Sequence, residues 1–433
     1  MMRLIFIVAA ALSFALPARA IEISEVTSPG GITAWLVQEP TIPFTALEIR
    51  FKGGGSLDAP GKRGATNLMT ALLEEGAGER DARAFAASRE ALAASYEFDT
   101  YDDSIRVSAR FLSENRDEAV ALLKSALNAP RFDVDAIERV RAQVLANIRS
   151  DAQDPGRIAR RTFDAAAFGD HPYGSSLNGT AESVAALSRD DLVEAKARTM
   201  TRDRLYVGAV GDITPDELGL LLDELLGDLP EQGAPMPGRT EFAPKGGITV
   251  VPFDTPQSVA VFGQAGITRQ DPDFFAAYVL NQILGAGGFA SRLTEEVREK
   301  RGLTYGISSY LVPMDYAEIY QGQVASANER MAETIEVVRA EWRRMAEEGV
   351  SEAELNDAIT YLTGAYPLRF DGNAPIANIL VGMQTQGLGI DYILTRNAKV
   401  EAVTQEDISR VARRLLDPEG LFFVVVGQPV GLQ

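Results

Sequence analysis

The same succession of elements occurs twice along the chain, at a constant spacing. The polar segment 188–192, reading SRDDL, is echoed by TQEDI at 404–408, and each precedes a helical pattern and an apolar strand pattern. The two strands, 205–211 and 421–427, lie 216 residues apart, as do the two polar segments (404 − 188). A constant offset across several unlike elements rarely arises by chance, so we predict two homologous domains of α+β type.

The period of the apolar residues predicts the other elements. The helix expected at 135–150 has a counterpart at 353–370, at nearly the same offset. In the first half we expect strands at 32–37, 45–51 and 103–111, and helices at 64–74, 80–96, 116–128, 135–150, 157–168 and 188–199.

Between the halves, the segment 230–247 is rich in proline and glycine and lacks apolar periodicity, which predicts a linker. We therefore expect domains at 21–230 and 248–433, joined by 231–247. A semi-rigid linker of this length lets two halves face each other across a cleft.

The first twenty residues have the features of a secretion signal. Arg3 provides a short positive region, and the apolar run 4–16 is too short to span a bilayer comfortably. Ala18-Arg19-Ala20 has the small-x-small form of a cleavage site. We expect export across the inner membrane, cleavage after Ala20, a periplasmic location and no membrane contact afterwards; an uncleaved anchor is the alternative.

Two residue counts exclude much metal and thiol chemistry. The chain has no cysteine, which rules out disulfides, thiolate catalysis and cysteine-ligated metals. Its single histidine, His171, cannot supply the two or three histidines of a typical catalytic zinc site. A net charge of −19 disfavours nucleic acid and anionic lipid as partners.

One stretch, 285–311, places a cation and a phenol near each other. Arg298 falls in the last turn of a predicted helix, and Gly302 suits the left-handed position that follows a helix. From position 303 the period changes to two, which predicts a strand with Tyr305 just inside it. Arg298 and Tyr305 could then offer hydrogen-bond donors to a carbonyl oxygen that gains charge during acyl transfer. A solvated arginine and a tyrosine packed in a sheet are the alternative.

The segment SRLTEEVREKRGLTYGISSYL at 291–311 resembles the C-terminal-half signature of the insulinase-like (M16) metallopeptidases of small-subunit type. HPYG at 171–174, followed by GT at 179–180, is similar to a segment of that family's first domain. The resemblance covers essentially the whole mature chain. It implies two domains, each a mostly antiparallel sheet with helices packed on one face, around a peptide-sized chamber. It also implies that Arg298 and Tyr305 bind the substrate carbonyl opposite a zinc ion.

The zinc-binding residues of that family are replaced here. Its catalytic members carry H-x-x-E-H on a helix after the first hairpin, and a second glutamate on a later helix. The histidine positions correspond to Asn67 and Ala71, the general-base position to Thr70, and the later glutamate to about Asn147. These side chains cannot perform the family's zinc hydrolysis, so we expect no metal or other cofactor on this chain.

The resemblance therefore implies the metal-free subunit of a heterodimeric M16-type zinc peptidase. An HxxEH-containing partner would supply the zinc, and this chain would help to bind the peptide substrate. A non-enzymatic peptide-binding or scaffold protein on the same fold is the alternative. Hydrolysis by this chain alone is a third possibility, although one histidine leaves little room for a Ser-His-acid arrangement.

Several other signals have weaker functional interpretations. G-x-G-x-x-A at 285–290 matches the dinucleotide fingerprint by letter, but a helix is predicted before it where a strand is needed, so a glycine hinge is favoured. His171 lies in a Pro/Gly turn, where a structural hydrogen bond is favoured. The segment 52–55 is either a plain turn or part of an edge strand that pairs with a peptide. The charged runs 341–348 and 410–414 are predicted to be solvated helix faces.

Overall fold

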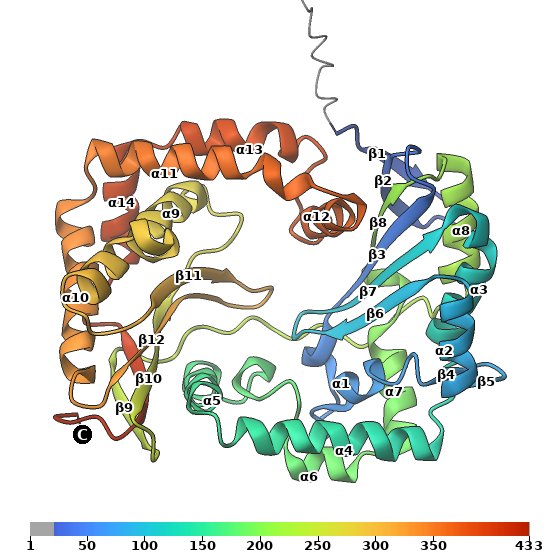
Figure 1. Ribbon diagram of the computed structural model, residues 1–433, viewed down its shortest axis with the longest axis horizontal. Coiled ribbons are helices and arrows are strands. Elements are labelled where there is room, and N and C mark those ends of the chain that lie inside the picture. Colours follow the sequence, from blue (N-terminus) through green and yellow to red (C-terminus); the bar gives the residue numbers. More distant parts are fainter. Residues whose placement is uncertain (1–20, 433) are drawn as a thin grey trace, which may run out of the picture.

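The computed structural model describes residues 21–432 and contains two large β-sheets surrounded by helices (Figure 1). The predicted signal segment, 1–20, lies outside the described residues. The first large sheet has the strand order β1-β2-β8-β3-β7-β6. Its strands are β1 (Ser24–Thr27), β2 (Thr33–Gln38), β3 (Phe44–Lys52), β6 (Ser95–Thr100), β7 (Ser104–Leu112) and β8 (Leu205–Gly211).

The second large sheet has the order β11-β12-β10-β13-β9 and repeats the first without its edge strand β1. In each sheet the closing strand, β8 or β13, has one parallel and one antiparallel neighbour, and all other pairs are antiparallel. The predicted α+β fold of two similar, mostly antiparallel halves is confirmed. The strands are β9 (Gly247–Pro252), β10 (Gln257–Ala265), β11 (Ile307–Pro313), β12 (Glu318–Ala327) and β13 (Phe422–Gly427).

Each large sheet packs one face against helices of its own half, which form the two largest apolar cores. The repeated polar segments start helices in the same way, because Ser188 and Thr404 form capping boxes with Asp191 and Asp407. The helices of the first half are α1 (Ala65–Thr70), α2 (Ala82–Ala91), α3 (Arg116–Asn128), α4 (Val134–Asp151), α5 (Pro155–Phe168), α6 (Ala181–Ala186), α7 (Arg189–Thr199) and α8 (Pro215–Leu226). Those of the second half are α9 (Phe274–Asn281), α10 (Met331–Glu348), α11 (Glu352–Ala365), α12 (Asn373–Thr385), α13 (Tyr392–Glu401) and α14 (Gln405–Leu415).

The other face of each large sheet is covered by a helix from the opposite half. Helix α12 packs against β3 and β8 of the first sheet, where Leu380 joins Trp35 and Val210 in a buried cluster (Figure 1). Helix α5 packs against β10 and β13 of the second sheet, where Phe163 lies 5.8 Å from Phe422 between ring centroids. This exchange buries apolar surface across the boundary, so the two halves stabilise each other.

Three sequence predictions about local structure are corrected. The helix expected at 80–96 ends at Ala91, and Tyr96 instead lies in β6, where its hydroxyl donates to the carbonyl of Ala119 at 2.7 Å. The helix expected at 64–74 is shortened to α1 and continues as turns. The segment 52–55 ends β3, a strand with neighbours on both sides, so it is a turn and not a peptide-pairing edge.

A hydrogen-bonded cluster joins the tips of the β6–β7 and β11–β12 hairpins, one from each half. The Tyr173 hydroxyl donates to Asp103 Oδ1 at 2.5 Å. The backbone amides of Asp315 and Tyr316 donate to Asp103 Oδ2 and to the Tyr173 hydroxyl, each at 3.2 Å. Lys52 Nζ lies 3.2 Å from Asp315 Oδ2. Burial raises the pKa of Asp103 to about 6, and it also raises the pKa of Tyr173.

His171 has a structural hydrogen-bonding role, as the sequence predicts. Its Nδ1 accepts a hydrogen bond from the Tyr173 amide at 3.3 Å, so Nε2 carries the proton and donates to the Gly238 carbonyl at 3.1 Å. Gly238 belongs to the predicted linker 231–247, which remains a prediction together with the domain limits. Burial lowers the pKa of His171, which favours the neutral ring that these bonds require.

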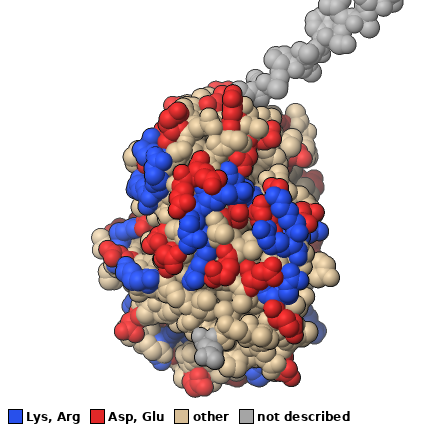
Figure 2. All heavy atoms as spheres, turned by 90° about the vertical axis from the view of Figure 1, so that its left-hand side faces the viewer, with Lys and Arg blue, Asp and Glu red and all other residues tan. Residues whose placement is uncertain are grey.

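Positive and negative side chains are intermixed on the face that lies at the left of Figure 1 (Figure 2). Arg410 and Arg414 pair with Asp273 and Asp271 at 2.7 and 2.5 Å, and Glu341 is buried. Most charged side chains of the two runs are exposed, so the predicted solvated helix faces are confirmed, with Glu341 as a buried exception. Within 21–432, no helix has the length and apolarity needed to cross a membrane.

Candidate functional site

Arg298 lies on a short helix with π-type hydrogen bonding, Thr294–Glu299. The amide of Lys300 donates to the carbonyl of Glu295, five residues back, at 2.9 Å. Gly302 ends this element with φ 59°, the left-handed conformation predicted for it, and its amide donates to the Arg298 carbonyl at 2.8 Å. Single π-turns of this kind are often found at functional sites.

The Arg298 side chain is held at the surface by an aromatic ring. Val297, its neighbour, is fully buried in the second core, and the Arg298 side chain is 33% exposed. Its guanidinium carbon lies 4.5 Å from the ring centroid of Phe289, and its Nε lies 3.5 Å from Glu299 Oε1. Phe289 is itself 72% exposed, so the pair stands open to solvent or to a ligand.

Tyr305 does not lie in the strand predicted for it, because β11 starts at Ile307. The Thr304 hydroxyl donates to the Ala325 carbonyl at 2.7 Å and accepts from the Gly306 amide at 3.0 Å. This local turn replaces the first ladder bonds of the expected strand. Tyr305 is 87% exposed in the resulting loop, which contradicts the alternative of a tyrosine packed in a sheet.

Arg298 and Tyr305 flank the same Gly302 turn, and both side chains are accessible. In residues 21–432, no hydrogen bond, ion pair or ring contact joins one to the other. Each therefore has donor atoms free to meet a third group. Their convergence on one oxygen atom remains a prediction.

The glycines before this segment serve helix packing. Residues 274–286 are helical, so a strand does not precede the G-x-G-x-x-A segment, and the dinucleotide interpretation is excluded. A Cβ atom on Gly285 would lie 2.2 Å from the Ser309 hydroxyl and 2.8 Å from the Ser309 amide. Gly285 therefore lets the helix approach β11 closely, which is more specific than the hinge suggested by the sequence.

The helix at the degenerate metal position is used for packing and hydrogen bonding. Asn67 donates from Nδ2 to Asn178 Oδ1 at 3.1 Å, and Asn178 donates to Asp151 Oδ2, at the end of α4, at 3.4 Å. Thr70 is buried, and its hydroxyl has no hydrogen-bond partner in the described part of the chain. Ala71 is exposed and has no donor atom.

Asn147 lies on the exposed side of α4 and accepts a hydrogen bond from Gln143 Nε2 at 3.0 Å. Helices α1 and α4 do pack against each other, but their polar groups at these positions bond to other neighbours. Among residues 21–432, no group of three or more His, Cys, Asp or Glu side chains could hold a metal ion. The residues therefore do not fit a zinc ion as catalytic relatives would hold it.

Two family models match this chain. Residues 34–181 match the model described as insulinase (peptidase family M16), and residues 186–362 match the model described as the peptidase M16 inactive domain. The chain belongs to the M16 peptidase family. This confirms the family suggested by the 291–311 and 171–174 segments.

The names of related proteins state different functions. A protein named non-peptidase homolog YmxG from Helicobacter pylori is 28% identical over 386 residues, which is 89% of each chain. An uncharacterized zinc protease, Rv2782c from Mycobacterium tuberculosis, is 29% identical over 410 residues and 92% of each chain. The comparison therefore includes both a protein named as lacking peptidase activity and one named as a protease.

Solved structures of M16 proteins match the whole architecture. The crystal structure of a peptidase M16 inactive domain from Pseudomonas fluorescens has a TM-score of 0.89 and 28% identity, covering 95% of this chain and 99% of that one. A protease structure from Helicobacter pylori has a TM-score of 0.84 at 17% identity, covering 94% and 100%, and supports the fold alone.

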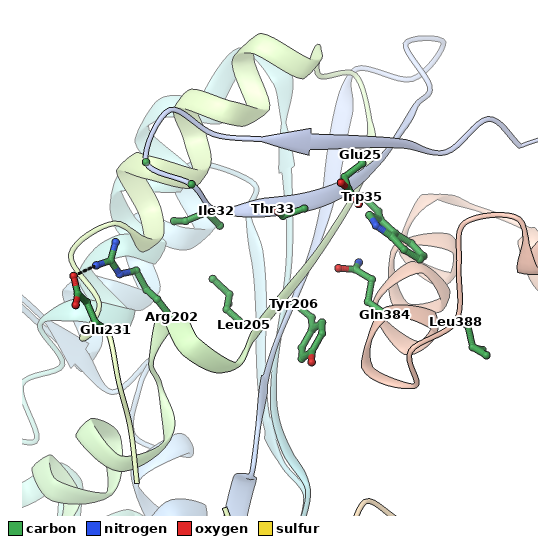
Figure 3. Close-up of a pocket in the computed structure, with 12 residues that line it drawn as sticks. Glu25, Ile32, Thr33, Trp35, Arg202, Leu205, Tyr206, Glu231, Gln384 and Leu388 are labelled. Atoms are coloured by element: carbon green, nitrogen blue, oxygen red, sulfur yellow. Dashed lines mark hydrogen bonds and ion pairs between the residues drawn. The ribbon is translucent and has the colours of Figure 1, made fainter. Parts of the chain in front are cut away.

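A cavity of about 500 Å³ lies beside strands β1, β2 and β8 and the end of α12. Figure 3 shows the residues that line it. Trp35 and Tyr206 line it from the first sheet and Gln384 from α12. Its arginine, Arg202, is paired with Glu231 at 3.1 Å, so that cation already has a counter-charge. Arg298 and Tyr305 do not line this cavity, which separates it from the candidate site.

Sequence reasoning missed Phe289, whose ring contacts the Arg298 guanidinium group. Phe289 follows two glycines, Gly287 and Gly288, and precedes the small residue Ala290, and such a sequence is a visible signal of an exposed aromatic residue in a loop. It also missed the Asp103–Tyr173 bridge, because the two residues are 70 positions apart and only the fold brings them together.

Proposed function

We propose that this chain is the metal-free subunit of a heterodimeric M16-type zinc peptidase, working in the periplasm after export. It contributes half of the peptide chamber together with Arg298 and Tyr305, whose donors hold the carbonyl oxygen of the bond to be cleaved. The zinc ion and the general base belong to a partner chain that contains HxxEH. The chain alone is inactive as a zinc peptidase.

The observation that carries this proposal is that a phenol, Tyr305, and a guanidinium group, Arg298, are both accessible in one short segment. Tyr305 is 87% exposed, although burying most of its ring would be favourable in a monomer. The Arg298 guanidinium group contacts the ring of Phe289, which is also exposed. Exposed aromatic and arginine side chains are typical of surfaces that bind a partner or a ligand.

Chemical complementarity supports the division of labour. A phenol and a guanidinium donate hydrogen bonds without deprotonation and suit a carbonyl oxygen that becomes negative. The degenerate positions Asn67, Thr70, Ala71 and Asn147 offer no metal site and no base of adequate strength. The chain thus retains substrate-holding groups while lacking those that activate water.

Co-expression with an HxxEH-containing secreted protein encoded beside this chain tests the proposal. The two chains should co-purify, and zinc should appear in the complex and in the partner but not in this chain. Peptide hydrolysis should require both chains and stop with a chelator. Stoichiometric zinc in the isolated chain, or full activity of the partner alone, would contradict the proposal.

A non-enzymatic role is the second candidate, and a specific observation favours it: the Helicobacter pylori relative is named a non-peptidase homolog. In that case the same exposed segment binds a peptide or a structural partner without turnover. The co-expression experiment separates the two roles. A stable complex that binds peptide and leaves it intact, with or without zinc, would support the non-enzymatic role.

A further inference from the structure

A cavity of about 300 Å³ lies where α12 meets α9 and α13, and all of its lining residues except Arg50 belong to the second half of the chain. Figure 1 shows α12 standing between the first sheet and the helices of the second half. Four arginines from distant parts of the sequence line the cavity, and within 21–432 no Asp or Glu lines it. They are Arg50 on β3, Arg269 after β10, Arg369 in the short turn 367–370, and Arg396 on α13.

The buried arginine of this cavity has neutral partners. Arg396 is 5% exposed, and its Nη1 donates to the Leu362 carbonyl at 2.7 Å and to Asn397 Oδ1 at 2.9 Å. Its guanidinium carbon lies 4.5 Å from the ring centroid of Tyr366. No ion pair with a carboxylate is formed by Arg396 in the described residues. A buried cation without a counter-charge is unfavourable unless a ligand supplies one.

Two further arginines are also uncompensated. Arg269 donates to the Tyr392 hydroxyl at 2.6 Å and lies 4.1 Å from the ring centroid of Phe274. The Arg369 side chain is exposed, and no side-chain hydrogen bond or ion pair holds it within 21–432. The fourth, Arg50, is neutralised in part, because its Nη2 lies 3.1 Å from Glu48 Oε1.

The acidic residues nearest to Arg269 in sequence are already engaged. Asp271 and Asp273 pair with Arg414 and Arg410 at 2.5 and 2.7 Å. They line an adjoining cavity that Arg269 also lines, whereas neither of them lines the arginine-lined cavity. Within 21–432, three of the cavity's arginines form no ion pair and no carboxylate lines the cavity, which contrasts with the net charge of −19 of the whole chain.

The remaining lining is mainly aromatic and apolar, with the amide side chains of Asn378 and Gln386 as its polar members. Phe274, Phe275, Tyr278, Tyr366 and Tyr392 supply ring surfaces, and Ile379 and Met383 of α12 supply apolar ones. Guanidinium groups bind planar oxyanions through paired N–H donors, and ring walls suit a flat apolar body. A volume of this size is at the lower end of small-molecule sites.

We propose that this cavity binds a small organic oxyanion, a carboxylate or a phosphate carried on a ring-sized apolar body. The proposal is independent of the peptidase role, because Arg298 and Tyr305 lie outside the cavity. Sodium benzoate and phenyl phosphate are the probes for the two anion types, and benzamide is the neutral probe of the same shape.

The test is calorimetric titration of the full mature chain at constant ionic strength. We expect at least one anion to bind with a Kd of about 1 mM or tighter, and benzamide to bind at least about tenfold more weakly. If only benzoate binds, the ligand is a carboxylate. If only phenyl phosphate binds, the ligand is a phosphate. Undetectable binding of both anions, or equal affinity for benzamide, would overturn the proposal.

Two variants locate the binding without disturbing the fold. Arg369→Gln should weaken anion binding about tenfold, since a charge-assisted hydrogen bond is lost, whereas Arg83→Gln on the exposed side of α2 should not. Gly382→Leu should abolish binding, because Gly382 lines the cavity and a Cβ there meets no atom within 4 Å. Gly364→Leu on α11 is the matched control, with equal space outside the cavity. Wild-type binding in both Arg369→Gln and Gly382→Leu would also overturn the proposal.

Discussion

The guanidinium carbon of Arg298 lies 4.5 Å from the ring centroid of Phe289, and both residues are open to solvent. The ring limits the directions in which the long arginine side chain can extend, so its donors are partly pre-oriented. In the proposed complex this is the contact that positions Arg298 towards the substrate carbonyl. Phe289 is thus a positioning residue rather than one that touches the reacting atoms.

Replacing Phe289 with leucine should therefore weaken turnover without abolishing it. A surface cation–π contact contributes about 0.5–1 kcal/mol, so kcat of the reconstituted complex should fall about two- to fivefold. Tyr361→Leu, which removes another exposed aromatic from α11, should leave kcat unchanged. Steady-state kinetics of the two variant complexes provide the comparison, and identical rates in both would remove the positioning role of Phe289.

Thr70 offers a test of whether the degenerate helix has any chemical role. It is 2% exposed, and its hydroxyl has no hydrogen-bond partner among residues 21–432, so Thr70→Val should raise the free energy of unfolding by roughly 1 kcal/mol. Thr66→Val on the same helix should lower it by about 1–3 kcal/mol, because the Thr66 hydroxyl donates to Asp58 Oδ1 at 2.6 Å.

Urea unfolding of both variants measures these changes, and peptide turnover of the Thr70→Val complex completes the test. We expect wild-type turnover, because the general base belongs to the partner. Loss of turnover in a stable Thr70→Val variant would assign catalysis to this chain and contradict the division of labour.

The sequence predicts the elements and the family better than the arrangement of side chains. Capping at Ser188 and Thr404 is local, and both helices begin where expected. The prediction that Tyr305 lies in a strand is wrong. Leu303–Gly306 have the alternating polarity of a strand, but hydrogen bonds of the Thr304 hydroxyl replace the ladder bonds there. The prediction that Tyr96 lies in a helix is wrong as well. The alanine-rich segment before Tyr96 favours a helix, and the strand residue that pairs with Tyr96 lies further along the chain. Periodicity is a local signal, whereas these outcomes depend on neighbours distant in sequence.

At the candidate site, too, some features can be predicted from the sequence and others cannot. The replacements at Asn67, Thr70 and Ala71 are readable from the sequence, since they are losses of donor atoms at fixed spacing. The exchange of α5 and α12 between the halves is not readable, because apolar faces do not specify which sheet they cover.

The exchanged helix α12 predicts that the two halves unfold together. Leu380 is fully buried between α12 and the first sheet, so Leu380→Ala should lower the free energy of unfolding by about 2–5 kcal/mol. Leu220→Ala on α8 is the control, since that side chain is 67% exposed and its loss should change stability by less than about 0.5 kcal/mol. Urea unfolding followed by tryptophan fluorescence and circular dichroism should show one coincident transition for Leu380→Ala. Two separated transitions would indicate that the halves are independent.

Asp103 predicts a specific pH dependence of stability. Burial raises its pKa from 3.8 to about 6 in the folded chain. Below pH 3.8 the carboxyl is protonated in both states. Between pH 3.8 and 6 only the folded state keeps the proton, so the contribution of Asp103 to stability falls as the pH rises through this window and stays low above it.

Asp103→Asn removes this group from the titration and keeps an acceptor for the Asp315 amide. The decrease in the free energy of unfolding between pH 4 and pH 6.5 should become smaller by about 1–2 kcal/mol. Part of the slope should remain, because burial also raises the pKa of Asp164 to about 6. Urea unfolding across this range measures the slopes, and a steeper fall in the variant would contradict the assignment.

The most direct test of the whole account is the turnover of the zinc-loaded complex carrying Arg298→Ala or Tyr305→Phe in this chain. Loss of one oxyanion donor costs about 2.7–4 kcal/mol, so each variant should lower kcat about a hundredfold or more. Complex formation and zinc content should be unchanged, and Arg83→Gln should turn over at the wild-type rate. Wild-type turnover in both Arg298→Ala and Tyr305→Phe would contradict the claim that this chain holds the substrate for its partner's metal.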